Sequence, residues 1–91
     1  MVDIKKGEKG FYVGDNEVES LAKIEFEPNG DDIIIDHTFV SQQLKGHNVA
    51  RQLLETVVDF AREENKKIIP VCSFAKAEMN KNEDYKDVLH K

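Results

Sequence analysis

The spacing of the apolar residues changes once, between Asp36 and Ala61, and this change constrains the fold more than any other feature of the sequence. Over Asp32–Val40 the residues are mostly β-branched or aromatic and alternate in character, which predicts a largely buried strand. Over Val49–Ala61 apolar residues recur every three or four positions, which predicts an amphipathic helix packed on a sheet. A strand therefore passes into a helix through a short polar joint, Gln42–Asn48, which contains one glycine.

Shorter patterns predict two strands before this unit and one after it. Gly10–Val13 is an aromatic and β-branched run, and Ala22–Glu27 alternates strictly between apolar and charged residues. Pro28–Asp31 carries turn residues at each position, so the second strand should form a hairpin with the strand that follows. Ile68–Cys72 is nearly uncharged and predicts a buried strand, paired in parallel with the strand before the helix.

Two features of these strands bear on where a binding site could form: the end of the parallel pair and the two faces of the long strand. Pro70 has no N–H group to donate, so the parallel pair should fail or splay near it. Strict alternation along the long strand gives it two faces, one with Ile33, Ile35, His37 and Phe39 and the other with Ile34, Asp36, Thr38 and Val40.

Two short helices should complete the chain. Ser73 is the expected N-cap of a helix over Phe74–Asn80, and Asn82 is the expected N-cap of another that continues to Val88. The element order is then β-β-β-α-β-α-α, an α/β fold of antiparallel strands with one parallel pair. A chain of 91 residues supports one hydrophobic core, so residues 1–91 should form a single domain.

Composition excludes several classes of partner. Eighteen acidic and thirteen basic residues give a formal charge of -5, which disfavours duplex nucleic acid. No apolar run approaches the roughly 20 residues of a membrane span, so we expect no membrane insertion. The single cysteine and the absence of a secretory signal predict a cytoplasmic protein. The three histidines and one cysteine lack metal-ligand spacing, so we expect no metal.

The polar joint is either an ordinary loop or an anion site. The first N–H groups of a helix have no intrahelical acceptor, and the helix dipole adds a partial positive charge, so an anion binds there readily. Gly46 lies just before the helix, with Lys45 and Arg51 on either side of it. Cys72 and Ser73 should emerge at the same edge of the sheet, because the carboxyl ends of parallel strands lie together.

Four segments in this order resemble the GNAT acetyltransferases. Gln43–Ala50 is similar to their acetyl-CoA loop, Q/R-x-x-G-x-G/A, which precedes an amphipathic helix. The order of four segments resembles the diminutive, single-domain members of the family: Asp36–Val40, then this loop, then Pro70–Phe74 and Asn82–Tyr85. The resemblance covers nearly the whole chain and implies a small GNAT-like fold in which the parallel pair splays at the coenzyme A site.

The resemblance also implies a set of residues that bind acetyl-CoA. The backbone N–H groups from Leu44 to Val49 would hold the diphosphate, and the splayed strand would hydrogen-bond the pantetheine arm. The implied cofactor-binding residues are Phe39, Val40, Leu44, Lys45, Gly46, His47, Asn48, Val49, Ala50, Ser73 and Phe74. Asn48 departs from the motif, which has a second small residue there, and its side chain should weaken or shift cofactor binding.

Two side chains are candidates for catalysis, and each has a structural alternative. Free cysteine is usually a small core residue, so Cys72 is either packing or, at the start of a helix whose dipole favours thiolate, an acetyl carrier. His37 is either a core histidine or a general base for the acceptor. Tyr85 matches the general acid of larger GNAT enzymes less well and should pack in the core.

These residues predict an acyltransferase that moves acetyl from acetyl-CoA to an amine, such as a protein lysine, or to a thiol, directly or through Cys72. Only a short segment, which begins with Gly14–Glu17, separates the first two strands, where larger GNAT domains have two helices that wall the acceptor site. The acceptor side should therefore be open to a bulky substrate or completed by a second subunit, which predicts either a monomer or a homodimer. The alternative is a non-catalytic module that binds coenzyme A or another protein.

Overall fold

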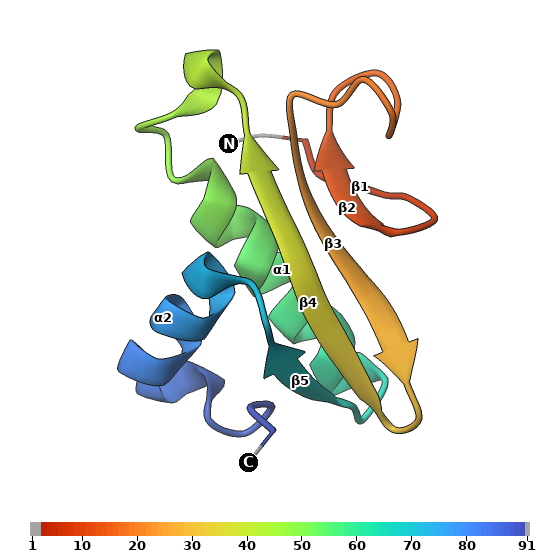
Figure 1. Cartoon of the computed structure of the whole chain (residues 1–91), viewed down its shortest axis with the longest axis vertical. Helices are drawn as coiled ribbons and strands as arrows, with labels where there is room; N and C mark the ends of the chain where they lie inside the picture. The colour runs from red at the N-terminus through yellow and green to blue at the C-terminus, as the bar shows by residue number, and fades with distance from the viewer. Residues whose placement is uncertain (1–2, 91) are drawn as a thin grey trace.

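The computed structural model describes residues 3–90, so residues 1, 2 and 91 of the expected domain lie outside it. The described chain forms five strands in the order β1-β2-β3-β4-β5, two α-helices and two 3₁₀ turns (Figure 1). The elements are β1 (Lys5–Lys6), β2 (Gly10–Val13), β3 (Ala22–Asn29), β4 (Asp32–Val40), η1 (Gln42–Leu44), α1 (Val49–Glu63), β5 (Lys67–Pro70), α2 (Ser73–Lys81) and η2 (Glu83–Tyr85). The expected α/β fold is confirmed, with antiparallel neighbours throughout except for the parallel pair β4–β5.

Helix α1 lies across one face of the sheet and α2 lies beside β5 and β4 (Figure 1). The predicted apolar stripe of α1 is buried against the sheet, which contributes its own fully buried side chains. Burial of each large aliphatic side chain stabilises the fold by about 1.5 to 3 kcal/mol. The largest fully buried side chains are those of Ile24, Ile33, Ile35, Val49, Leu53, Leu54, Val57, Val58, Ile68 and Met79.

A β-bulge at Asp36 changes which side chains of β4 face the core. Glu25 pairs with His37, but the next residue of β3, Phe26, pairs with Ile35, so Asp36 is an extra residue in the ladder. An extra residue shifts the alternation of side chains by one position. The expectation that His37 and Phe39 share the face of Ile35 is therefore wrong.

Beyond the bulge the inward side chains are those of Thr38 and Val40. They pair with Ile24 and Ala22, which are both 0% exposed. Phe39 pairs with the half-buried Lys23 on the outer face and is 41% exposed, and His37 is exposed as well. Alternation along the sequence could not reveal this shift, because a bulge adds a residue without changing the residue types around it.

The predicted splay of the parallel pair is confirmed. Ladder pairing between β4 and β5 ends at Ile35 and Pro70. Within residues 3–90, the rest of β4, Asp36–Val40, has a strand neighbour only on the β3 side. The two strands therefore diverge and leave one backbone edge of β4 without a strand partner.

Smaller differences from expectation occur at element ends. β5 ends two residues before Cys72, and α2 begins at Ser73, so Cys72 occupies the N-cap position that we expected for Ser73. Asn82 is an N-cap as predicted, since its Oδ1 accepts a hydrogen bond from the Asp84 amide at 3.0 Å, although it caps a 3₁₀ turn. β1 was not expected, because two exposed lysines carry no strand pattern.

Candidate functional site

The joint between β4 and α1 folds as two successive turns. η1 follows β4 after one residue, Ser41, and the chain then passes through left-handed backbone at Gly46 (φ 88°) and Asn48 (φ 59°, ψ 24°) before α1 begins. Glycine adopts this conformation at little cost, and asparagine tolerates it better than most residues. The side chain of Asn48 makes no capping hydrogen bond, so it leaves the N–H groups of the first turn of α1 uncovered.

The amides of this loop fall into two sets. Those of Leu44, Lys45 and His47 donate to carbonyl oxygens of the loop itself at 3.0 to 3.3 Å. Those of Gly46, Asn48, Val49 and Ala50 have no hydrogen-bond acceptor within residues 3–90. Of the amides from Leu44 to Val49 that the resemblance implies for the diphosphate, three are therefore already used by the loop, two in the 3₁₀ turn and that of His47 in the turn that follows.

A cavity of about 560 Å³ lies against the free amides, a volume within the usual range for small-molecule sites. The loop and the start of α1 form one side, and α2 forms the other. Its lining residues are Val40, Leu44, Lys45, Gly46, Asn48, Val49, Ala50, Arg51, Phe74, Glu78 and Lys81. Eight of these are residues that the sequence analysis assigned to cofactor binding.

Three residues that line the cavity were not among the predicted site residues. Glu78 and Lys81 follow Phe74 at helical spacing, so all three lie on one face of α2, and that spacing was the available signal. Lys81 forms an ion pair with Glu78 at 3.1 Å. Arg51 lies in the first turn of α1 and makes no ion pair within 4.0 Å in the described part of the chain.

Three predicted cofactor-binding residues lie outside the cavity lining. Phe39 points to the opposite face of the sheet because of the bulge, although its backbone remains on the splayed strand. The side chains of His47 and Ser73 are exposed and do not line the cavity.

Cys72 lies where β4 and β5 diverge. Its amide donates to the carbonyl oxygen of Ile35 at 3.0 Å, and its Sγ lies 3.4 Å from Oγ1 of Thr38. Thr38 and the cavity residue Val40 share the inner face of β4, two residues or roughly 7 Å apart along the strand. The thiol is partly buried and belongs neither to the deep core nor to the open surface.

The environment of Cys72 favours the thiolate. Burial raises the pKa of the thiol, but hydrogen bonds with the Thr38 side chain and backbone lower it. The backbone N–H groups of Ala75 and Phe74, in the first turn of α2, add to this effect. The net result is a pKa below the ordinary value of a cysteine thiol.

The structure does not bring His37 and Cys72 together. His37 lies on the outer face of β4, and Thr38, its neighbour in the chain, is the residue that reaches the sulfur. The alternative that His37 is a core histidine is wrong, because the side chain is exposed.

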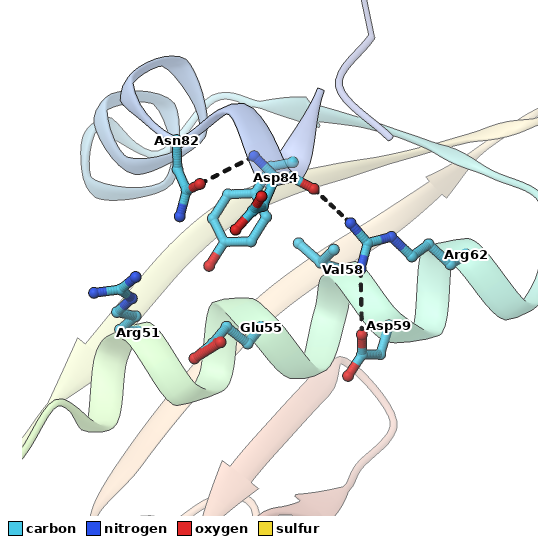
Figure 2. A pocket seen from close by; sticks show the side chains of 8 residues that line it. Arg51, Glu55, Val58, Asp59, Arg62, Asn82 and Asp84 are labelled. Atoms are coloured by element: carbon cyan, nitrogen blue, oxygen red, sulfur yellow. Dashed lines mark hydrogen bonds and ion pairs between the residues drawn. The ribbon is translucent and has the colours of Figure 1, made fainter. Parts of the chain in front are cut away.

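A second cavity, of about 390 Å³, lies between α1 and η2 and shares Arg51 with the first. Figure 2 shows Arg51 and Glu55 projecting from successive turns of α1 towards the segment that carries Asn82. Tyr85 lines this cavity and is 5% exposed, so the prediction that it packs in the core is confirmed. Burial, and then the charge of Glu55, raise the pKa of Tyr85, while Arg51 partly offsets this effect.

Two further features concern the described residues only. Residues 3–90 contain no group of three or more His, Cys, Asp or Glu side chains arranged to hold a metal ion. They also contain no helix long and apolar enough to cross a membrane.

Comparisons with known proteins agree with this geometry. The model of the GCN5-related N-acetyl-transferase family matches residues 10–88. The fold superposes with a TM-score of 0.83 on the NMR solution structure of a GCN5-like candidate N-acetyltransferase from Staphylococcus aureus, with 47% sequence identity over 98% of this chain and 88% of that one. No curated protein matches the chain. The chain therefore belongs to the GCN5-related N-acetyltransferase family, and both the fold and the acetyltransferase class expected from its sequence are confirmed.

Proposed function

We propose that the protein transfers an acetyl group from acetyl-CoA to an amine or thiol acceptor. The observation that carries this proposal is the set of free amides at Gly46, Asn48, Val49 and Ala50, which face one cavity at the N-terminus of α1. Such donors at a helix N-terminus suit a diphosphate. Lys45 and Arg51 add positive charge to the same wall.

The opposite end of the site suits the thioester. From the loop, the inner face of β4 runs through Val40 and Thr38 towards the divergence of the strands. Beyond the bulge, the β4 edge away from β3 has no strand partner among the described residues, so its donors and acceptors can bind an extended pantetheine arm. A backbone donor placed at the developing oxyanion would contribute roughly 3 to 4 kcal/mol to catalysis.

The two catalytic candidates suit different steps. Cys72 lies on the cavity side, where its thiolate can accept acetyl from the thioester. His37 lies on the outer face of the sheet, where it can take a proton from an acceptor amine that approaches from that side. In the direct route, the acceptor attacks the thioester through the gap between the strands and Cys72 carries no acetyl group.

The outer face suits a large acceptor. Phe39 lies on this face and is 41% exposed, and Val71, where the strands separate, is 61% exposed. No helix covers this side of the sheet in Figure 1. We therefore include a protein lysine among the acceptors. A free thiol also fits a reducing compartment, so we place the protein in the cytoplasm.

Intact-mass spectrometry with acetyl-CoA tests the proposal. We expect release of coenzyme A in the presence of an amine or lysine-peptide acceptor, together with a gain of one acetyl group on the acceptor. If acetyl-CoA binds but no acceptor from an amine and thiol panel gains mass, the protein is a non-catalytic binding module. Comparison of the wild type with Cys72→Ala then separates the routes, because only the covalent route adds acetyl to the wild-type chain.

A further inference from the structure

The bulge at Asp36 decides which side chain of β4 reaches the cysteine. Without the extra residue, His37 would face inward and Thr38 would face outward. With it, the Thr38 hydroxyl lies 3.4 Å from Sγ of Cys72, across the gap where β4 and β5 diverge. This contact joins the two strands beyond the end of their backbone ladder.

We propose that Thr38 is a positioning residue for acyl transfer, whose hydroxyl holds the Cys72 sulfur at the divergence of the strands and stabilises it as the nucleophile. This inference rests on the proposed function in its covalent form, in which Cys72 carries the acetyl group. Thr38 acts through Cys72 and forms no bond to the acetyl group.

The step that Thr38 supports is a thioester exchange. The Cys72 thiolate attacks the carbonyl carbon of the acetyl thioester, so a bond forms between that carbon and Sγ. The bond from the carbonyl carbon to the coenzyme sulfur breaks, and its electron pair leaves with coenzyme A. The proton that Cys72 released to solvent is balanced by the proton that the coenzyme thiolate takes up, so the exchange needs no oxidant or reductant.

Hydrogen bonds, and not nearby charged side chains, stabilise the Cys72 thiolate. The titratable side chains on the adjoining elements are mostly exposed, and only Asp32 on β4 and Glu78 on α2 are partly buried; the exposed ones are Asp36, His37, Lys67, Lys76 and Lys81. None of them is among the main influences on the thiol pKa. The largest influences on the thiol pKa are burial, which raises it, and the Thr38 hydroxyl, which lowers it. Loss of the hydroxyl should therefore shift the titration of Cys72 upward.

The pH dependence of Cys72 alkylation by iodoacetamide, without acetyl-CoA, tests the inference. Cys72 is the only cysteine, so the rate reports one thiolate. We expect the wild-type midpoint to lie below the ordinary value of a cysteine thiol and the Thr38→Val midpoint to lie about one pH unit above that of the wild type. Thr38→Ser should restore the wild-type midpoint, because it keeps the hydroxyl.

Matched controls separate this effect from a general loss of packing. Thr56→Val removes a partly buried hydroxyl from α1, where it donates to the Gln52 carbonyl at 2.8 Å, and should leave the alkylation midpoint unchanged. Thr38→Ala gives a second variant without the hydroxyl, should Thr38→Val fail to fold. An unchanged midpoint in a folded hydroxyl-free variant overturns the inference.

The alkylation midpoint and acetyl transfer are measured separately, so the role of Thr38 and the acyltransferase activity can fail independently. A shifted midpoint with no acetyl transfer to any acceptor supports the Thr38 contact and contradicts the acyltransferase. Acetylation of Cys72 by acetyl-CoA with an unchanged midpoint in Thr38→Val supports the acyltransferase and contradicts the role of Thr38.

Discussion

The amide of Cys72, two residues beyond the last ladder position of β5, donates a hydrogen bond to the carbonyl oxygen of Ile35 at 3.0 Å. The Val71 amide donates to the same oxygen at 3.0 Å. The carbonyl of Ile35 therefore anchors the point at which the strands separate, and the thiol is held directly beside the gap. Pro70 ends the ladder and the bulge at Asp36 turns β4, so two local irregularities together produce the opening.

Gly46→Ala should weaken acetyl-CoA binding about tenfold, or about 1.4 kcal/mol. An added Cβ meets no atom within 4 Å, but the left-handed φ of 88° strains any residue with a side chain, by roughly 1 to 2 kcal/mol. The strained loop should move its free amides away from the diphosphate. Isothermal titration calorimetry measures the change in affinity.

Gly30→Ala is the matched control for this variant. Gly30 also has a left-handed φ, 63°, and an added Cβ also meets no atom within 4 Å, but it lies in the β3–β4 turn, away from the cavity. Both variants should lose similar stability, and only Gly46→Ala should lose affinity. Equal affinity in both variants contradicts a role for the loop.

Asn48→Gly should tighten acetyl-CoA binding about fivefold, or about 1 kcal/mol. The Asn48 side chain lines the cavity and caps no amide, so its removal clears space beside the free donors. Asn65→Gly is the matched control, because Asn65 has nearly the same left-handed φ, 56°, at the far end of α1. Looser binding in Asn48→Gly would show that the amide side chain helps to hold the ligand.

His37→Ala should slow the acceptor step and spare the loading of Cys72. The imidazole lies on the outer face of β4, away from the sulfur, so acetylation of Cys72 by acetyl-CoA should proceed at the wild-type rate. Transfer to an amine should fall by about 10²-fold or more, the typical contribution of a general base. Single-turnover kinetics followed by intact mass separate the two steps, and a slower loading step in His37→Ala contradicts the assignment.

Asp87→Asn should reduce the acid sensitivity of stability. Asp87 forms a two-point ion pair with Arg62, with both N–O distances at 2.9 Å, and the guanidinium holds the pKa of the carboxyl below its usual value. A lowered folded-state pKa stabilises the fold above the unfolded pKa of about 3.9, and this stabilisation is lost as pH falls through the folded pKa. The pair is largely exposed, so the loss at pH 7 should stay below about 1 kcal/mol.

Thermal unfolding between about pH 2 and pH 7 checks this prediction. The stability difference between the wild type and Asp87→Asn should narrow below about pH 4 and continue to narrow as the pH falls through the lowered pKa of Asp87. Asp15→Asn is the control, because the Asp15 side chain makes no ion pair or hydrogen bond in the described chain. A constant difference across the range contradicts the linkage.

Most of the fold was predictable because its signals are local. β4 is indicated by its own β-branched residues, and α1 by the helical spacing of its own apolar residues. Both elements begin where predicted. The end of the β4–β5 ladder was predictable from Pro70 alone, since proline has no N–H group to donate to a neighbouring strand. β1 and η1 could not be predicted, because two lysines and a short polar turn have no apolar pattern of their own and form only through contacts with the rest of the fold.

The site was less predictable because it depends on register between elements. The loop position followed from the strand–helix joint, and eight of the predicted cofactor-binding residues line one cavity. The bulge at Asp36 follows from pairing with β3, and it exchanged the expected places of His37 and Thr38 relative to Cys72. The use of three loop amides by η1 and the turn after it depends on backbone angles that residue types do not specify.

The central claim is that the free amides at the start of α1 receive the diphosphate of acetyl-CoA. Backbone amide NMR of the ¹⁵N-labelled protein, titrated with acetyl-CoA, tests it directly. We predict large downfield shifts at Gly46, Asn48, Val49 and Ala50, and small shifts at Gly30 and Asn65. Saturable binding that leaves those four loop amides unmoved, with shifts centred on another surface, would contradict the account.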